Sequence, residues 1–175
     1  MSKYQIDSAH STAGFSIKHM MIAKVHGSFQ KLSGTLDFDP QNPALTQVEV
    51  TIDAASINTN ESQRDAHLKS ADFFDVEKFP TLTFKSTRVE GTPGELKLMG
   101  ELTIHGITKS VVLEVEGPSA ELKDPWGNTK LGASATTKIK RKDFGLTWNA
   151  ALEAGGFLVG DDVQITLDVQ FVKQS

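Results

Sequence analysis

The densest group of side chains that could do chemistry lies in one short segment, where Arg64, Asp65 and His67 occur within four residues. A guanidinium offers several directed hydrogen-bond donors, and a neighbouring imidazole and carboxylate can exchange protons. These residues either grip the polar headgroup of a ligand or act on it as acid and base. The structural alternative is that Arg64 and Asp65 form ion pairs that fasten this segment to the rest of the molecule.

Aromatic residues follow this polar group directly. Phe73 and Phe74 lie between two aspartates, and Phe79 comes five residues later. An insert of this kind in a strand-rich chain often covers a site. The three rings either close a cavity as a lid or form a small satellite core beneath the insert. Together with the polar group, Phe73 and Phe74 make up the expected mouth of a binding site.

The histidines do not predict a metal site. The chain has five histidines and no cysteine, and no two histidines have the helical i, i+4 or the H-x-H spacing of metal ligands. We expect no metal, no other cofactor and no disulfide. His10 and His67 are expected to hydrogen-bond backbone or carboxylate groups near the mouth of the site.

Motifs of the common enzyme classes do not occur in the sequence. There is no G-x-S-x-G element, and the adjacency of His10 and Ser11 does not define a nucleophile with its base. Neither a phosphate-binding loop nor a dinucleotide fingerprint occurs. We therefore expect a protein that is not an enzyme.

The length of 175 residues suits one domain over residues 1–175. The net charge of −4, with both signs mixed, does not predict nucleic-acid binding, and the basic run 138–142 is expected to be a solvated strand end. No apolar run approaches the ~20 residues of a membrane-spanning helix, and from the polar first residues we expect no signal peptide. We expect a cytoplasmic protein as the chain stands, or a periplasmic one if a signal was removed, with a homodimer as one alternative.

Apolar and polar residues alternate through most of the chain, which predicts strands with one dry and one wet face. The last run, from Val163 to Phe171, keeps this period of two over nine residues. The inward positions of all the runs are expected to line a ligand tunnel. They are Phe15, Ile17, Leu36, Phe38, Val50, Ile52, Leu82, Phe84, Leu98, Leu102, Leu113, Ile165 and Leu167.

Turn residues separate these runs at 39–43, 91–94 and 124–128. A further break at His105 and Gly106 predicts a tight hairpin in which Gly106 supplies a positive φ.

Two stretches break the alternation. A short helix is predicted within 58–74, capped by Asn58 with Glu61 three residues later. The second stretch, 143–156, is a helix or a long loop that ends at Gly155 and Gly156. Within it, Phe144 is expected to plug a barrel end and Gly145 to relieve a tight backbone.

About eight antiparallel strands with one or two short helical inserts form either a sandwich or a barrel. Runs of nine to ten residues span roughly 30 Å, which favours the barrel. A closed eight-stranded barrel is filled by its own side chains or holds one small ligand. The expected fold class is therefore all-β, a single extended eight-stranded antiparallel β-barrel.

Motifs along almost the whole chain carry a family resemblance. They are Asp7-x-x-His10-Ser11, Phe15-x-x-Lys18-His19, Gly27-x-Phe29, Ser56-Ile57-x-Thr59, Arg64-Asp65-x-His67-Leu68, Asp72-Phe73-Phe74-Asp75, Pro80-x-x-Thr83-Phe84-x-Ser86, Gly100-x-Leu102-Thr103-Ile104-x-Gly106-x-Thr108, Arg141-x-Asp143-Phe144-Gly145 and Val159-Gly160. Each motif is weak alone, but together and in this order they are highly specific. On these residues the chain resembles the YceI-like family, the lipocalin-like polyisoprenoid-binding proteins of bacteria.

The resemblance implies a lipocalin-like barrel with a hydrophobic tunnel. It also implies a long-chain amphiphile in that tunnel, such as an isoprenoid quinone or a fatty amide. We therefore expect a non-enzymatic binding or carrier protein for such a lipid. The alternatives are an enzyme that acts on the lipid through Arg64, Asp65 and His67, and a structural or interaction module without a ligand.

Overall fold

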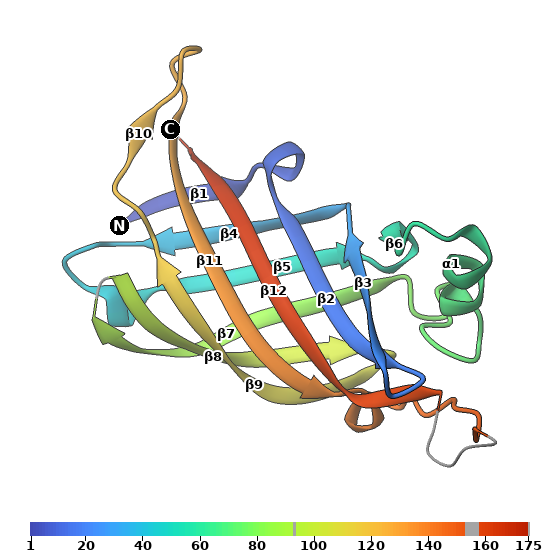
Figure 1. Cartoon of the computed structure of the whole chain (residues 1–175). Helices are drawn as coiled ribbons and strands as arrows, with labels where there is room; N and C mark the ends of the chain where they lie inside the picture. Colours follow the sequence, from blue (N-terminus) through green and yellow to red (C-terminus); the bar gives the residue numbers. More distant parts are fainter. Residues whose placement is uncertain (93, 153–157, 175) are drawn as a thin grey trace.

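Eight strands close into an antiparallel barrel in the computed structural model, which describes residues 1–92, 94–152 and 158–174 (Figure 1). The hydrogen-bonded ring closes where the last strand pairs with the first. In order around the ring the strands are β1 (Ser2–Ile6), β4 (Leu32–Phe38), β5 (Gln47–Asp53), β7 (Thr81–Thr92), β8 (Gly94–Ile104), β9 (Ile107–Gly117), β11 (Thr129–Lys140) and β12 (Val159–Lys173).

A smaller ribbon branches from β12. β2 (Thr12–His19) uses the same edge of β12 as β1, but it pairs with residues 159–168 whereas β1 pairs with residues 171–173. The chain passes from β1 to β2 through the 3-10 turn η1 (Ser8–His10). Beyond β2 follow β3 (Ala23–Phe29) and the two-residue strand β6 (Ile57–Asn58). The barrel wall therefore forks at one end.

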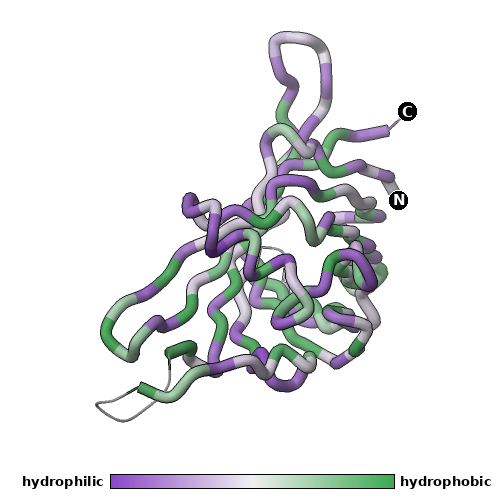
Figure 2. The backbone as a smooth tube through the Cα atoms, turned by 90° about the vertical axis from the view of Figure 1, so that its right-hand side faces the viewer, coloured by the Kyte–Doolittle hydropathy of each residue, from purple (hydrophilic) through white to green (hydrophobic). Residues whose placement is uncertain are grey.

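The alternation of hydrophobic and hydrophilic residues runs along the strands as predicted (Figure 2). On β8, Leu96, Leu98 and Ile104 are buried, whereas Lys97 and Glu101 between them are exposed. The all-β antiparallel barrel predicted from this period is confirmed.

The predicted helix is α1 (Ser62–Lys69), but its cap is not Asn58. Glu61 is the N-cap, and its carboxylate accepts hydrogen bonds from the backbone N–H groups of Gln63 and Arg64. Asn58 is still part of β6, paired with Ser28, so the chain is extended there. No helix in the described part of the chain is long and apolar enough to cross a membrane.

The second predicted insert begins as the 3-10 turn η4 (Arg141–Phe144) and continues as a loop. Phe144 is only 1% exposed within the hydrophobic core, so it is structural as expected, and the φ of 72° at Gly145 confirms that a glycine relieves the backbone there. Gly155 and Gly156, the predicted end of this insert, lie outside the described residues.

The two-residue hairpin between β8 and β9 is also as predicted, with Gly106 at a φ of 74°. Of the turn expected at 91–94, position 93 lies outside the described residues. A short outlying strand, β10 (Leu122–Lys123), precedes β11 and pairs with its first residues.

The two ends of the barrel differ in how they are built. At one end, here called the terminal end, both chain termini lie close to β10 (Figure 1). A buried cluster packs there, formed by Tyr4, Leu36, Phe38, Leu131 and Phe171. At the opposite end, here called the insert end, lie α1, η4 and the turn between β2 and β3 (Figure 1).

Candidate functional site

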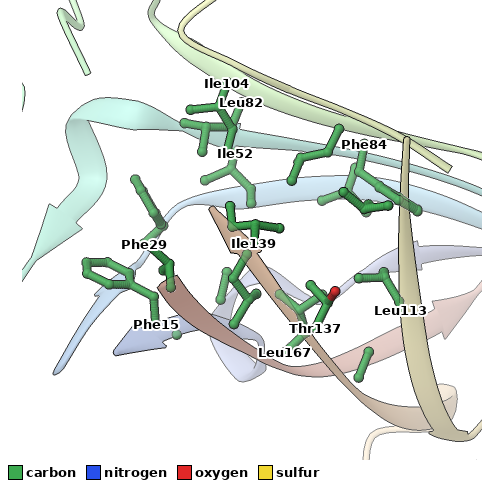
Figure 3. Close-up of a pocket in the computed structure, with 18 of the residues that line it drawn as sticks. Phe15, Phe29, Ile52, Leu82, Phe84, Ile104, Leu113, Thr137, Ile139 and Leu167 are labelled. Atoms are coloured by element: carbon green, nitrogen blue, oxygen red, sulfur yellow. The ribbon is translucent and has the colours of Figure 1, made fainter. Parts of the chain in front are cut away.

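A cavity of about 340 Å³ occupies the inside of the barrel. Every strand of the ring contributes side chains to its lining, and so do β2 and β3. Figure 3 shows Phe84, Leu113 and Leu167 converging on this space from three different strands. The volume lies within the range of about 300–1,000 Å³ that is typical of small-molecule sites.

Strand parity located this lining well. Phe38 is the one predicted tunnel residue that does not line the cavity, because it ends β4 and packs into the terminal-end cluster, where it is 4% exposed. Its inward direction is as predicted, but it lies beyond the lumen. The other predicted positions that the structure places on the lining are Phe15, Ile17, Leu36, Val50, Ile52, Leu82, Phe84, Leu98, Leu102, Leu113, Ile165 and Leu167.

The sequence analysis did not identify the wall of the cavity that β11 forms. β11 presents Ala133, Ala135, Thr137 and Ile139 to the lumen. Most of these side chains are small or carry a hydroxyl, so a search for large apolar residues at every second position does not mark the strand. The available signal was the period of two itself, with small residues in the inward positions. Small side chains on this wall leave volume in the lumen.

Two glycines on the wall hold aromatic rings flat against it. A Cβ added at Gly27 would overlap the ring of Phe15, and one added at Gly100 would overlap the ring of Phe84. Phe15 and Gly27 are also direct cross-strand partners in β2 and β3. An aromatic ring that covers a glycine on the neighbouring strand is a known way to pack a curved sheet. Here it also keeps bulky side chains out of the middle of the lumen.

The ionisable side chains on the described part of the lining all belong to the insert end. They are Lys18, His19, Arg64, His67 and Arg141, and no carboxylate is among them. The remaining lining is apolar apart from a few hydroxyl groups. The cavity is therefore apolar almost throughout, and the few ionisable side chains on its lining gather at the insert end.

Arg64 and Asp65 both bind Thr59, which is 4% exposed. Arg64 donates from Nε to Thr59 Oγ1 over 2.7 Å and from Nη2 to the Thr59 carbonyl over 2.8 Å. Asp65 Oδ1 accepts from the Thr59 backbone N–H over 2.9 Å and from its hydroxyl over 2.5 Å. The two residues fasten the insert as expected, but through hydrogen bonds to one threonine instead of ion pairs. Asp65 does not line the cavity, whereas Arg64 does.

His67 joins α1 to the loop that follows η4. Its Nε2 lies 2.8 Å from Asp72 Oδ2, and its ring meets the rings of Phe73 and Trp148 edge to face at centroid distances of 5.0 and 4.7 Å. His67, Phe73 and Trp148 all line the cavity. The expected carboxylate partner of His67 is confirmed, and Trp148 is a lining residue that the sequence analysis did not single out.

Two further expectations concern His10 and the remaining aromatic residues. His10 Nδ1 lies 2.8 Å from Asp7 Oδ2, which confirms its expected carboxylate partner. His10 does not lie near the mouth, however, because η1 places it at the corner between β1 and β2, and it is not part of the cavity lining. Phe74 lines the cavity and packs edge to face on Phe29 at 5.6 Å. Phe79 instead packs on His105 and is not part of the lining, so it does not act as a lid.

Arg141 contradicts the prediction that the run 138–142 is a solvated strand end. It is only 2% exposed, and its guanidinium donates to four backbone carbonyls, those of Leu146, Trp148, Val159 and Gly160. Burial lowers the pKa of Arg141 from the ordinary arginine value, while Asp161 acts in the opposite direction. Arg141 thus ties the start of β12 to the loop that carries Trp148. The planar, five-donor guanidinium suits this task.

The proposed acid–base group does not come together at one point. Arg64 and Asp65 direct their polar atoms at Thr59, and His67 directs Nε2 at Asp72. Among the described residues no group of three or more metal-ligating side chains lies close enough to hold an ion. The arrangement at this end fits the enclosure of an apolar molecule better than a reaction on it.

A closed antiparallel barrel around an apolar cavity defines the lipocalin-like class of fold. The YceI-like domain model matches residues 4–171, nearly the whole chain. The chain therefore belongs to the YceI-like family, as the motifs predicted.

Known relatives match this chain over most of their lengths. The protein YceI of Salmonella newport (strain SL254) is 38% identical over 175 residues, which cover 99% of this chain and 88% of the relative. Among solved structures, Burkholderia cenocepacia BcnA superposes with a TM-score of 0.80 at 25% identity, covering 94% of this chain and 98% of that one. The Campylobacter jejuni YceI protein superposes with a TM-score of 0.76 at 34% identity, covering 90% of each chain.

A more distant structure shares the fold alone. A polyisoprenoid binding domain from Saccharophagus degradans superposes with a TM-score of 0.73 at 15% identity, covering 99% of this chain and all of that one.

Proposed function

We propose that this protein is a non-enzymatic carrier that holds a long-chain isoprenoid, or a similar amphiphilic lipid such as an isoprenoid quinone or a fatty amide, in its barrel. The observation that carries the proposal is the apolar cavity that runs along the inside of the barrel, with the ionisable side chains of its lining at the insert end. The tail would lie along the apolar walls, with the headgroup near Arg64 and His67. The fold match to a polyisoprenoid binding domain supports the same class of ligand.

Apolar contacts suffice for useful affinity. Each buried methylene is worth about 0.8 kcal/mol, so ten buried carbons contribute roughly 8 kcal/mol. That corresponds to a dissociation constant of about 1 μM before the ordering of the ligand is subtracted. The same arithmetic implies weak chemical selectivity, because methylenes discriminate poorly between similar chains.

The direct test is native mass spectrometry of the protein as purified from cells, followed by organic extraction of whatever is bound. A co-purifying lipid of defined mass is the expected result. A clean apo mass that does not change after incubation with prenyl and acyl lipids would contradict the proposal. The same spectra give the oligomeric state, for which a homodimer stays a prediction.

A pair of variants on β11 makes the test specific for the lumen. Ala135 faces the cavity and is 8% exposed, whereas its neighbour Thr136 faces solvent. We expect Ala135→Phe to reduce bound lipid at least tenfold, because the ring occupies the volume of the tail. Thr136→Phe adds the same side chain to the outside and should bind lipid as the parent does. Equal loss in both variants would mean that the strand, and not the lumen, was disturbed.

A further inference from the structure

The turn between β2 and β3 exposes three consecutive large apolar residues at the insert end. Met20, Met21 and Ile22 are 45%, 63% and 85% exposed. They lie opposite the start of β12, since the Met20 backbone N–H donates to the Leu158 carbonyl and Val159 pairs with His19. His19 and Val159 also line the cavity. An apolar projection thus adjoins the insert end of the cavity.

The backbone of this turn is not optimised for folding. Met20 and Met21 have φ values of 54° and 61°, and the Ile22 N–H donates to the His19 carbonyl, which together describe a type I′ turn. Such turns favour asparagine and glycine at the two central positions, because positive φ is costly for other side chains. The two methionines occupy positions where the fold alone would favour small residues. Features that cost stability in this way are often functional.

The charge of the hairpin is equally one-sided. Residues 12–29 contain no aspartate or glutamate, although the whole chain has a net charge of −4. Lys18 and Lys24, both exposed, are direct cross-strand partners just below the turn. Like charges in directly opposite positions destabilise a strand pair. Two carboxylates lie nearby, but both face lysines outside the hairpin. Asp161 lies 3.4 Å from Lys142, and Asp162 lies 3.3 Å from Lys140.

We propose that the β2–β3 hairpin docks the protein on a lipid bilayer that contains anionic headgroups. The apolar tip enters the boundary between headgroups and acyl chains, and the lysine pair meets the phosphate level. An apolar edge with flanking lysines is the composition of interfacial membrane anchors. The docked hairpin brings the insert end of the cavity to the membrane surface. A lipid can then pass between bilayer and barrel with little of its tail exposed to water, a step that rests on the proposed carrier function.

The experiment is vesicle flotation of the full chain with two kinds of vesicle, phosphatidylcholine alone and phosphatidylcholine with added phosphatidylglycerol. We expect the protein to float with the anionic vesicles and much less with the neutral ones. Lys24→Ala should lower the affinity for anionic vesicles about fivefold, the contribution of one lysine near such a surface. The absence of any flotation with anionic vesicles would overturn the proposal.

A variant that suits the turn better separates docking from folding. Met20→Asn with Met21→Gly places the favoured pair of a type I′ turn at the tip, so thermal stability should be kept or raised. Its affinity for anionic vesicles should nevertheless fall at least tenfold. The matched control is Leu122→Ser with Trp126→Ser, which removes two residues that are 71% and 83% exposed at the terminal end. Equal flotation of the tip variant and the parent, or equal loss in the control, would refute the proposal.

Loading measured in solution distinguishes this proposal from the carrier function. The tip variant should still take up a lipid added from detergent and show its mass by native mass spectrometry. A protein that loads lipid but does not float would refute only the docking. A protein that floats but never loads lipid would refute only the carrier function.

Discussion

At the scale of single residues, the burial of Arg141 is the feature that the sequence pattern does not predict. Arg141 lies in a run of basic residues of which the neighbours Lys140 and Lys142 are well exposed. Its guanidinium replaces water for four backbone carbonyls, two in the loop after η4 and two at the start of β12. A buried carbonyl that loses its donor costs about 1–3 kcal/mol. Arg141 therefore holds the backbone at Trp148, while His67 and Phe73 pack against its ring.

Arg141→Met should lower the free energy of unfolding by about 3 kcal/mol, because it keeps an unbranched apolar side chain but removes every donor. Urea denaturation followed by circular dichroism measures this loss. Lys140→Met is the matched control, since that side chain is exposed, and it should change stability by less than about 0.5 kcal/mol. Similar stabilities of the two variants would show that the hydrogen bonds of the guanidinium do not stabilise the insert end.

At the scale of elements, the corner between β1 and β2 decides how the barrel closes. Asp7 caps η1 there, and its carboxylate lies 2.8 Å from both Lys130 Nζ of β11 and His10 Nδ1. These contacts, with Lys130 the larger cause, lower the pKa of Asp7 to about 2. Three strands are thus tied together at the point where β12 changes its partner from β1 to β2.

The pH dependence of stability follows from this pKa. Since the pKa of Asp7 is lower in the folded state than in the unfolded chain, its contribution is complete above about pH 4 and disappears as the pH falls through about 2. We expect Asp7→Asn to cost about 2 kcal/mol near neutral pH and almost nothing at pH 2. Chemical denaturation at a series of pH values measures the difference. Asp168→Asn, an exposed carboxylate of β12, should show a difference that stays small throughout, and a constant difference for Asp7→Asn would contradict the argument.

At the scale of the whole molecule, the length of the barrel limits the cargo. β8 has 11 residues, which span roughly 36 Å at ~3.3 Å per residue. With the usual tilt of about 40°, the wall stands roughly 27 Å high. This height approaches the ~30 Å hydrocarbon core of a bilayer, which two acyl chains fill end to end. The buried cluster at the terminal end fills part of this height, so the lumen is shorter than the wall and limits the length of tail that the barrel can enclose.

Affinity should accordingly rise with tail length. For prenyl lipids of increasing length, each added isoprene unit should tighten binding at least tenfold until the tail fills the lumen, because each buried methylene contributes about 0.8 kcal/mol. Beyond that length the affinity should level off. Competition titrations measure the series, and thermal shifts provide a second readout because a bound ligand stabilises the folded state. An affinity that does not depend on length would mean that the tail lies outside the barrel.

Much of this architecture is readable from the chain because strand parity is a local property. Side chains in a strand alternate between faces whatever its partners are, so inward residues such as Phe84 and Leu113 are identifiable in advance. β11 escaped notice because its inward residues are small. The cap of α1 was assigned to Asn58 because a capping pattern in the sequence tolerates a shift of a few residues. Only the pairing of β6 shows that the chain is still extended at Asn58.

The sequence by itself determined that the protein is an antiparallel all-β barrel of the YceI-like family and which side chains face inward. Tertiary structure alone decided where along the barrel each inward residue lies. It placed Phe38 beyond the lumen, buried Arg141, assigned Arg64 and Asp65 to Thr59, and forked the wall at β12. The reason is physical, since the period of two depends on neighbouring residues, whereas register, closure and burial depend on pairings such as β1 with β12 across almost the whole chain.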